Sequence, residues 1–218
     1  LQAACSSFIY ALHTASKFIE SGTHTKVLVI GSDKMSSIVD YTDRKTSILF
    51  GDGAGAVLLE PSADETGIID ARMYSDGSGK KYLYQPAGGS MLPASLDTVV
   101  NKQHFVHMDG QAVFKVAVTK MADVAEEMMK RNNLTSDDIA FLTPHQANKR
   151  IIDDSAKKLG IAPEKVVITV DRHGNTSAAS IPLALDVARK DGRVKNGDLL
   201  LFEARGGGFT WGSALVRW

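Results

Sequence analysis

The sequence has few of the features that mark several large classes of protein. Only one of its 218 residues is a cysteine, which excludes a disulfide framework within the chain and the small secreted folds that depend on one. The 25 basic and 25 acidic side chains cancel, so no excess positive charge favours nucleic acid or an anionic membrane surface. No apolar run approaches the roughly 20 residues of a membrane span, and the start has no signal-peptide pattern. We therefore expect a soluble, intracellular globular protein.

The pattern of apolar residues predicts alternating helices and strands. Apolar residues recur at helical spacing over four segments: 5–21, 110–131, 147–159 and 176–190. Short apolar runs predict buried strands at six places: 26–30, 56–59, 139–143, 166–170, 199–202 and 213–217. Gly31 is expected to end the first strand, and residues 76–103, rich in glycine, proline, serine and lysine, predict a long loop. This alternation is typical of an α/β fold, and the length suits one large domain or two modest ones.

Cys5 stands where the first predicted helix begins. The free N–H groups and the dipole of a helix N-terminus favour a thiolate, so the pKa of this thiol is expected to fall and its sulfur to be nucleophilic. The alternative is a buried cysteine that packs as a small apolar side chain. The residues alone leave both interpretations open.

Two polar segments follow predicted strands, where α/β proteins often carry their working residues. His145 can donate a hydrogen bond or exchange a proton near neutral pH; the alternative is a surface or helix-capping histidine. Asn175 precedes a predicted helix, so it can cap that helix or direct its amide at a reacting carbonyl oxygen. The residue types and positions leave both pairs of roles open.

The other glycine and histidine clusters do not indicate a specific binding site. Gly206–Gly208 can let backbone approach a ligand closely or can simply connect two strands tightly. Gly51–Gly55 precedes a strand and completes no G-x-G-x-x-G, so we reject a dinucleotide cradle there. His104 and His107 have no cysteine or carboxylate partners at ligand spacing, so no metal site is predicted.

One cysteine, one histidine and one asparagine in this order, each at or before a helix, form a more specific pattern than any of them alone. Five strings surround them: Ala3–Phe8 (AACSSF), Phe50–Gly55 (FGDGAG), Pro144–Asn148 (PHQAN), Gly174–Pro182 (GNTSAASIP) and Gly206–Leu215 (GGGFTWGSAL). Together they resemble the β-ketoacyl-acyl carrier protein synthase III family, the thiolase-like condensing enzymes that start bacterial fatty-acid synthesis. The resemblance covers essentially the whole chain.

The resemblance implies a thiolase-like fold, layered α-β-α-β-α, made of two similar α/β halves. Residues 1–63 would be the C-terminal part of the N-terminal half, which carries the nucleophile. Residues 64–218 would be a complete C-terminal half, which carries the histidine and the asparagine. The family has a further segment before the cysteine, so we expect that segment to be a separate chain, to lie outside the structure or to have been cleaved. An intact mass of these 218 residues alone, with no companion polypeptide, would contradict this.

The resemblance also assigns chemical roles. The Cys5 thiolate would attack the thioester of a short acyl-CoA, which we expect to be acetyl-CoA although the sequence does not distinguish it from a branched starter, and CoA would leave. Backbone N–H groups of Cys5 and Gly207 would hold the tetrahedral oxyanion. His145 and Asn175 would hydrogen-bond the thioester carbonyl of malonyl-acyl carrier protein and stabilise the enolate formed as CO2 departs. Because decarboxylation creates the carbanion without a strong base, His145 is expected to work uncharged.

Further positions match the family's binding residues. The CoA and pantetheine contacts would be Arg44, Gly110, Phe114 and Asn148. The docking stretch for the acidic carrier protein would be Gln146, Ala147, Asn148, Lys149 and Arg150, with help from Lys115. Gln111 and Lys149 depart from the family pattern, which usually has an asparagine and an apolar residue there. The resemblance implies no permanently bound cofactor and no metal, and it implies a homodimer in the bacterial cytoplasm.

Three alternative functions compete with this interpretation. A papain-like protease uses the same trio, but Cys5 lacks the C-G-S-C-W signature, and no disulfide can form within the chain. A sibling condensing enzyme of secondary metabolism would keep the trio and change the acyl pocket. A non-catalytic half or partner of a condensing complex would usually lose the cysteine, which is present here. The last two stay open, and an activity assay with the absent segment added would separate them.

Overall fold

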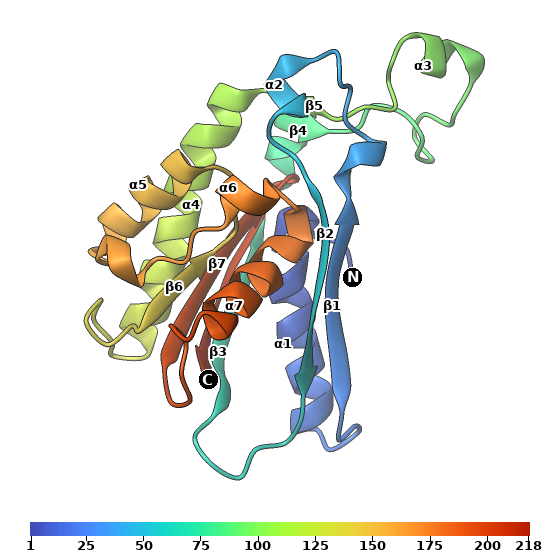
Figure 1. Ribbon diagram of the computed structural model, residues 1–218. Helices are drawn as coiled ribbons and strands as arrows, with labels where there is room; N and C mark the ends of the chain where they lie inside the picture. The colour runs from blue at the N-terminus through green and yellow to red at the C-terminus, as the bar shows by residue number, and fades with distance from the viewer.

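The first helix lies between two sheets of different size (Figure 1). The computed structural model describes residues 1–218 and confirms the α/β architecture. The smaller sheet pairs β1 (Val27–Lys34) and β2 (Asp52–Leu59), which are antiparallel. The larger sheet has the order β3 (Gly67–Ser75), β8 (Thr210–Arg217), β7 (Leu199–Gly206) and β6 (Phe141–Pro144), in which only β6 and β7 are parallel. A short antiparallel pair joins β4 (Leu83–Tyr84) and β5 (His107–Met108).

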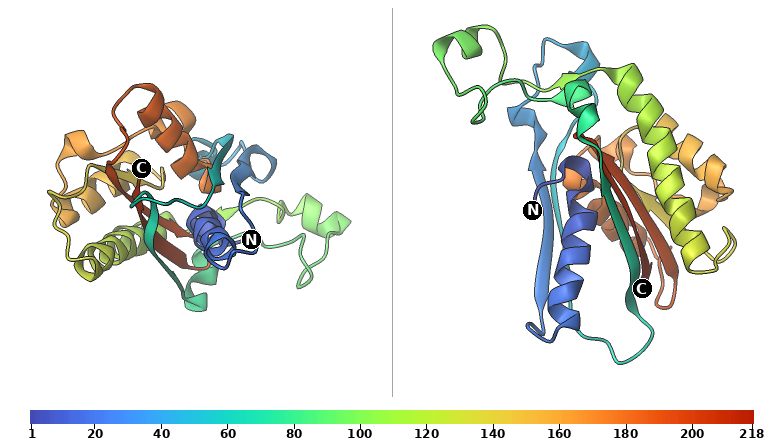
Figure 2. Two further views of the ribbon diagram at one scale, coloured as in Figure 1. Left: turned by 90° about the horizontal axis from the view of Figure 1, so that it is seen from below. Right: turned by 180° about the vertical axis from the view of Figure 1, so that it is seen from behind.

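Helices cover both faces of the larger sheet (Figures 1 and 2). The α-helices are α1 (Ser7–Glu20), α2 (Arg44–Ser47), α3 (Leu96–Val100), α4 (Gly110–Arg131), α5 (Lys149–Leu159), α6 (Val170–His173) and α7 (Ser180–Lys190). The 3-10 turns are η1 (Ala4–Ser6), η2 (Met35–Ser37), η3 (Gly77–Tyr82), η4 (Pro163–Lys165) and η5 (Ser177–Ala179). Helices α1 and α7 pack on one face and α4 and α5 on the other, so the sheet is buried between two helical layers.

Strand β7 shows most clearly how the sequence forms this core. Side chains alternate between the two faces of a strand, and every residue of β7 is buried. Leu200, Phe202 and Ala204 therefore join the cluster under α1 and α7. Leu199 and Leu201 join the cluster under α4 and α5. The prediction of a fully buried strand here is confirmed.

The two strands of the smaller sheet differ from the expectation. β1 continues through Gly31 to Lys34, and β2 starts at Asp52, inside the glycine-rich segment. Gly31 does not end the strand; a side chain there would lie 2.4 Å from the carbonyl oxygen of Ala178. The prediction that both strands are buried is also wrong, because their residues alternate between covered and open faces.

Three further segments correct the sequence interpretation. Residues 166–170 form no named strand, because only Val166 makes an isolated bridge, to Leu142. The predicted loop 76–103 contains η3, β4 and α3. The last predicted helix begins later than expected, at Ser180, so Pro182 lies in its first turn, where a missing N–H breaks no helical hydrogen bond.

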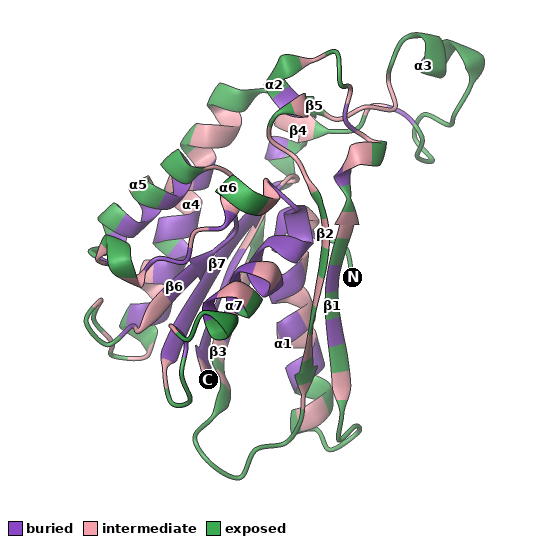
Figure 3. Ribbon diagram, viewed as in Figure 1, coloured by how far each residue is buried: buried purple, intermediate pink, exposed green.

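Figure 3 shows exposed residues along β1 and α3, and several of them are apolar. Leu28 and Ile30 of β1 are exposed, whereas Val29 between them joins the core cluster with α1. Helix α3 stands apart from the rest of the molecule (Figures 1 and 2), with Leu96, Val99 and Val100 exposed. No helix has both the length and the apolar character needed to cross a membrane.

Candidate active site

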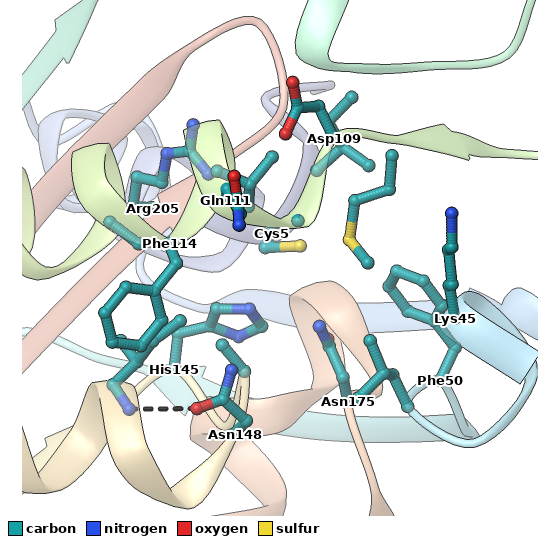
Figure 4. Close-up of a pocket in the computed structure, with 18 of the residues that line it drawn as sticks. Cys5, Lys45, Phe50, Asp109, Gln111, Phe114, His145, Asn148, Asn175 and Arg205 are labelled. Carbon is teal, nitrogen blue, oxygen red and sulfur yellow. Dashed lines mark hydrogen bonds between the residues drawn. The ribbon is translucent and has the colours of Figure 1, made fainter.

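The structure brings Cys5, His145 and Asn175 together on one cavity of about 790 Å³ (Figure 4). The cavity lies where the parallel strands β6 and β7 end and where α4 and α5 begin. Carboxyl ends of neighbouring parallel strands meet at one edge of a sheet, which is where α/β proteins form ligand sites. Residues from both ends of the sequence thus share one site.

Cys5 is positioned by the tight turn η1, which depends on an unusual backbone conformation at Ala4 and on a glycine at position 206. Ala4, directly before it, has a φ of 49°, the left-handed region that a non-glycine residue adopts at a cost of about 1 kcal/mol. Strand β7 passes so close that a Cβ on Gly206 would lie 2.7 Å from the backbone nitrogen of Cys5. The turn η1 is therefore held against the end of β7 because position 206 is a glycine.

The thiol of Cys5 does not behave as the helix-dipole argument predicts. Its pKa is raised above the ordinary cysteine value, because burial disfavours the thiolate. The Ser177 hydroxyl and the charge of Arg205 act in the opposite direction. The expectation of a lowered pKa is wrong: η1 and α1 do lead from this residue, but the removal of water outweighs them.

His145 directly follows β6 and is only 2 % exposed. Its Nδ1 lies 2.9 Å from the hydroxyl oxygen of Ser180 in α7, and that hydroxyl lies 2.6 Å from the carbonyl oxygen of Ser177. Burial and the nearby charge of Arg205 lower the pKa of His145 to about 3. The imidazole is therefore neutral at physiological pH, the state that the predicted role requires.

Asn175 forms an Asx turn and lines the cavity wall. Its Oδ1 accepts a hydrogen bond from the Ser177 backbone N–H at 3.0 Å. Its own backbone bonds with Leu49 and Gly51, which fixes the residue beside the start of β2. Because the oxygen is occupied, the Nδ2 amide is left to donate into the cavity (Figure 4). The expectation that Asn175 caps the following helix is wrong, because the N-cap residues of η5 and α7 are Thr176 and Ala179.

Several predicted binding residues reach the same cavity. Gly110 and Phe114 of α4 line it. Asn148 also lines it, and its Oδ1 caps α5 by accepting from the Ile151 backbone N–H at 2.9 Å (Figure 4). Gln111, one of the two departures from the family pattern, is a lining residue as well.

Two predicted residues lie off the cavity wall. Arg44 is exposed on α2, and its neighbour Lys45 lines the cavity instead. Gly207 lies in the turn between β7 and β8, where a Cβ would meet the carbonyl oxygen of Leu83 at 3.0 Å. The side of Gly207 that a side chain would occupy therefore faces β4.

The predicted docking stretch divides into a buried and an exposed part. Gln146 is 1 % exposed and makes four hydrogen bonds inside the protein, to the backbones of Pro144, Val167, Thr169 and Val170. It cannot face a partner, so its predicted docking role is wrong, and it holds the segment after η4 in place. Ala147 is half-buried on the cavity wall, whereas Lys149, Arg150 and Lys115 are exposed. The guanidinium of Arg150 lies 4.6 Å from the centre of the Phe114 ring.

The sequence interpretation missed two buried charged residues on β7. Glu203 and Arg205 continue the row of Leu199 and Leu201 toward the cavity. Burial raises the pKa of Glu203 to about 7, and its Oε1 accepts a hydrogen bond from the Ser155 hydroxyl at 2.7 Å. Arg205 lines the cavity beside Cys5 (Figure 4). Charged residues at alternate positions of an otherwise apolar strand are the signal that could have revealed them.

Comparison with known proteins agrees with this geometry. The family model of 3-oxoacyl-(acyl-carrier-protein) synthase III matches residues 1–77, and the model of its C-terminal part matches residues 129–218. A β-ketoacyl-(acyl-carrier-protein) synthase III of Chlorobium chlorochromatii is 56% identical over 220 residues, which cover 100% of this chain and 67% of the relative. The chain belongs to the synthase III family. This is a family of condensing acyltransferases.

Solved structures confirm the thiolase-like fold of the synthase III family. The 3-oxoacyl-(acyl-carrier-protein) synthase III of Aquifex aeolicus superposes with a TM-score of 0.90 at 45% identity, covering 100% of this chain and 66% of that one. The priming β-ketosynthase of the R1128 polyketide pathway superposes with a TM-score of 0.87 at 36% identity, covering 99% of this chain and 64% of that one. The chain thus spans about two thirds of the length of these synthases.

Proposed function

We propose that this synthase III protein condenses a short acyl-CoA with malonyl-acyl carrier protein, with loss of CO2, and so forms a 3-oxoacyl-carrier product that initiates fatty-acid synthesis. The observation that carries the proposal is the meeting of Cys5, His145 and Asn175 on one cavity. The proposed acyl donor is acetyl-CoA. No permanently bound cofactor and no metal take part in the proposed reaction.

The first half-reaction is acyl transfer to Cys5. The thiol ionises, and its sulfur attacks the thioester carbonyl. The proposed oxyanion hole is the N–H of Cys5 together with the backbone N–H of Gly207, which does not line the cavity but follows Gly206, the residue packed against the Cys5 nitrogen. The C–S bond to CoA then breaks, and the CoA thiolate takes up the proton that the thiol released. The raised pKa of Cys5 means that little thiolate exists at neutral pH, so the rate of acyl transfer should rise with pH.

The second half-reaction makes and uses a carbanion. The malonyl thioester carbonyl accepts hydrogen bonds from His145 Nε2 and Asn175 Nδ2, so the C–CO2 bond breaks with its electron pair delocalised as the enolate. The enolate carbon attacks the acyl carbonyl on Cys5, and the Cys5 thiolate leaves. Neutral donors suffice for this step, in agreement with the low pKa of His145.

The substrates are proposed to enter from the side on which α4 and α5 begin. Gly110, Phe114 and Asn148 would contact the pantetheine arm, with Lys45 or Arg44 further out. The exposed cations Lys115, Lys149 and Arg150 would face the acidic carrier protein.

Assembly and organisation are part of the same proposal. The two thiolase-like halves would be residues 1–63 and 64–218, in a cytoplasmic homodimer. Exposed Leu96, Val99 and Val100 on α3 support a second copy as partner, because an apolar patch that stands apart from the core needs a cover. Replacing Leu96 and Val100 with aspartate should shift the mass in light scattering from dimer to monomer; an unchanged dimer mass would contradict this role for α3.

The test of the proposed function is product formation from acetyl-CoA and malonyl-acyl carrier protein, followed by mass spectrometry of the carrier. We expect the 3-oxobutyryl carrier with the native protein. C5A should abolish it, and H145A and N175A should leave acetyl transfer to Cys5 while stopping condensation. A native protein that forms no 3-oxoacyl carrier with any acyl-CoA would overturn the proposal.

A second candidate is a priming synthase of secondary metabolism with a different donor, which the likeness to the R1128 priming β-ketosynthase supports. A panel of acetyl, isobutyryl and hexanoyl donors separates the two. A clear preference for acetyl favours the fatty-acid role, whereas a preference for a longer donor favours the sibling enzyme.

A further inference from the structure

Arg205 carries a buried positive charge that nothing in the protein neutralises. The residue is 4 % exposed, and its Nε and Nη2 are buried without a hydrogen-bond partner. None of the ion pairs of the structure includes it. Burying a guanidinium without a partner is unfavourable, so an unsatisfied one at a cavity wall calls for a ligand.

The surroundings of Arg205 fix the plane of its guanidinium and cover two of its three nitrogens, Nε and Nη2. The guanidinium carbon lies 3.5 Å from the centre of the Phe209 ring. That ring in turn stacks on Tyr82, with centroids 6.0 Å apart. Stacking satisfies the face of a guanidinium, but its N–H donors lie in the plane and point outward. Nη1 is not among these buried atoms, so it is the nitrogen that can donate to a ligand in the cavity, and a carboxylate is an anion that accepts such a charge-assisted hydrogen bond.

The other charged groups of the cavity do not supply that anion. Asp109 is the only acidic residue that lines it; it is exposed, and its Oδ1 accepts from the Ala112 backbone N–H at 3.1 Å. Lys45 adds a second positive charge, and the ring of His107 completes the titratable lining with His145 and Cys5. Glu203, two residues before Arg205 on the same face of β7, is bound to Ser155.

Arg205 also lies within electrostatic reach of the reacting groups. Its charge lowers the pKa of both Cys5 and His145. Burial lowers its own pKa to about 10, so the guanidinium stays protonated at neutral pH. A ligand of Arg205 would therefore lie next to the sulfur. In an acyl-CoA or acyl carrier thioester the phosphates lie beyond the pantetheine arm, so an anion beside the sulfur must belong to the acyl group.

We propose that Arg205 is a specificity-determining residue that binds the free carboxylate of a thioester substrate beside Cys5. The proposal rests on the proposed function, since it takes thioesters as the substrates. Two sources supply this chemistry: the malonyl group of the extender, or a second carboxylate on a dicarboxylic acyl donor such as succinyl-CoA. An ion pair to the malonyl carboxylate would aid binding and oppose loss of CO2, so its effect would appear in KM and not as a loss of kcat.

The first test needs no thioester and so is independent of the proposed function. Cys5 is alkylated with iodoacetate and, separately, with neutral iodoacetamide; in both reactions the sulfur displaces iodide. The rate with iodoacetate is divided by the rate with iodoacetamide, so that the fraction of Cys5 present as thiolate cancels. The ratio should fall about tenfold in R205M, because a charge-assisted hydrogen bond is lost. R205K should keep much of the native rate ratio, because lysine retains the positive charge. R193M, which removes a surface arginine paired with Asp191, should have the native ratio.

An equal ratio in the native protein and in R205M would overturn the proposal. A measurement on the native protein alone guards against misfolding of R205M: succinate should slow alkylation by iodoacetate, and succinamide should not. Equal effects of the two compounds would also overturn it.

The second test separates the two sources on the intact protein. If the donor carries the carboxylate, R205M loses acylation of Cys5 by succinyl-CoA and keeps acylation by acetyl-CoA. If the extender carries it, R205M raises the KM for malonyl-acyl carrier protein and leaves acetylation of Cys5 unchanged. If R205M shows neither of these changes, the proposal for Arg205 is overturned. This holds even if acetylation and condensation by the native protein establish the proposed function.

Discussion

The Ser180 hydroxyl lies between His145 Nδ1, at 2.9 Å, and the Ser177 carbonyl oxygen, at 2.6 Å. A hydroxyl has one proton, so it can serve only one of them. When the proton goes to Ser177, Nδ1 must be the donor and Nε2 presents a lone pair to the cavity. When it goes to Nδ1, Nε2 carries the proton and can donate to an oxyanion. The structure has the first arrangement, in which the hydroxyl donates to the Ser177 carbonyl oxygen, so the proposed role of His145 requires this hydroxyl to turn to Nδ1 when substrate binds.

Replacing Ser180 with alanine should therefore impair condensation more than acyl transfer. S180A removes the group that can hold Nδ1 as an acceptor, and we expect condensation to slow roughly tenfold or more. Acetylation of Cys5 should continue at its native rate, because that step does not use His145. Rapid-quench measurement of the two half-reactions checks this. S213A, which removes another buried serine hydroxyl bound to a carbonyl, is the matched control. Equal loss in both half-reactions would contradict the account.

The pH profile of Cys5 alkylation should report the burial of the thiol. Because burial raises its pKa, the rate with iodoacetamide should reach its midpoint above that of a free cysteine. R205M and S177A should each move the midpoint higher still, because the guanidinium charge and the Ser177 hydroxyl both lower this pKa. A midpoint below that of free cysteine would instead support the helix-dipole expectation.

Gly206 should tolerate no side chain. In G206A the new Cβ would lie 2.7 Å from the backbone nitrogen of Cys5 and 2.8 Å from the carbonyl oxygen of Ala3, so η1 must move. We expect a loss of about 1–3 kcal/mol in the free energy of unfolding and loss of Cys5 acetylation. G77A is the control, since a Cβ at Gly77 meets nothing within 4 Å. Denaturant titration and acetylation assays measure both effects, and native acetylation in G206A would show that the close approach is unimportant.

Glu203 should make the protein less stable as pH rises. Its pKa is about 7 in the folded protein and near the ordinary value of 4.5 in the unfolded chain, so the folded state binds the extra proton between these values. The stabilisation is present below pH 4.5 and is lost as pH rises through 7, by roughly 3 kcal/mol in total. E203Q should remove this part of the pH dependence. Thermal unfolding of both proteins from about pH 4.5 to about pH 8.5 tests it, and parallel curves would contradict the assignment.

Local pattern predicts the elements whose stabilising contacts are local. α4 spans residues 110–131 as expected, because its apolar stripe is continuous and Asp109 caps its first turn through the Ala112 N–H. The prediction of a strand at 166–170 is wrong, because the backbone there is held by distant groups: Leu142 accepts from the Val167 N–H, and Gln146 accepts from those of Thr169 and Val170. A run of apolar residues does not distinguish a strand from buried irregular backbone.

The candidate site likewise has features that the sequence predicts and features that depend on the packed fold. The resemblance of the surrounding strings to the synthase III family singles out Cys5, His145 and Asn175. The pKa of Cys5 does not follow from the sequence, because it depends on how completely the fold removes water from the thiol. The sequence can mark Arg205 as a charged residue in an apolar strand, but that its side chain has no partner is visible only in the packed structure.

The central claim is that Cys5 carries the acyl group during the reaction. The most direct measurement exposes the intact protein briefly to acetyl-CoA, digests it and determines the mass of the peptide that contains Cys5. The account predicts one acetyl group on this peptide, its disappearance when malonyl-acyl carrier protein is added, and no acetyl group there in C5A. An acetyl group on another residue, or turnover to the 3-oxoacyl carrier by C5A, would contradict it.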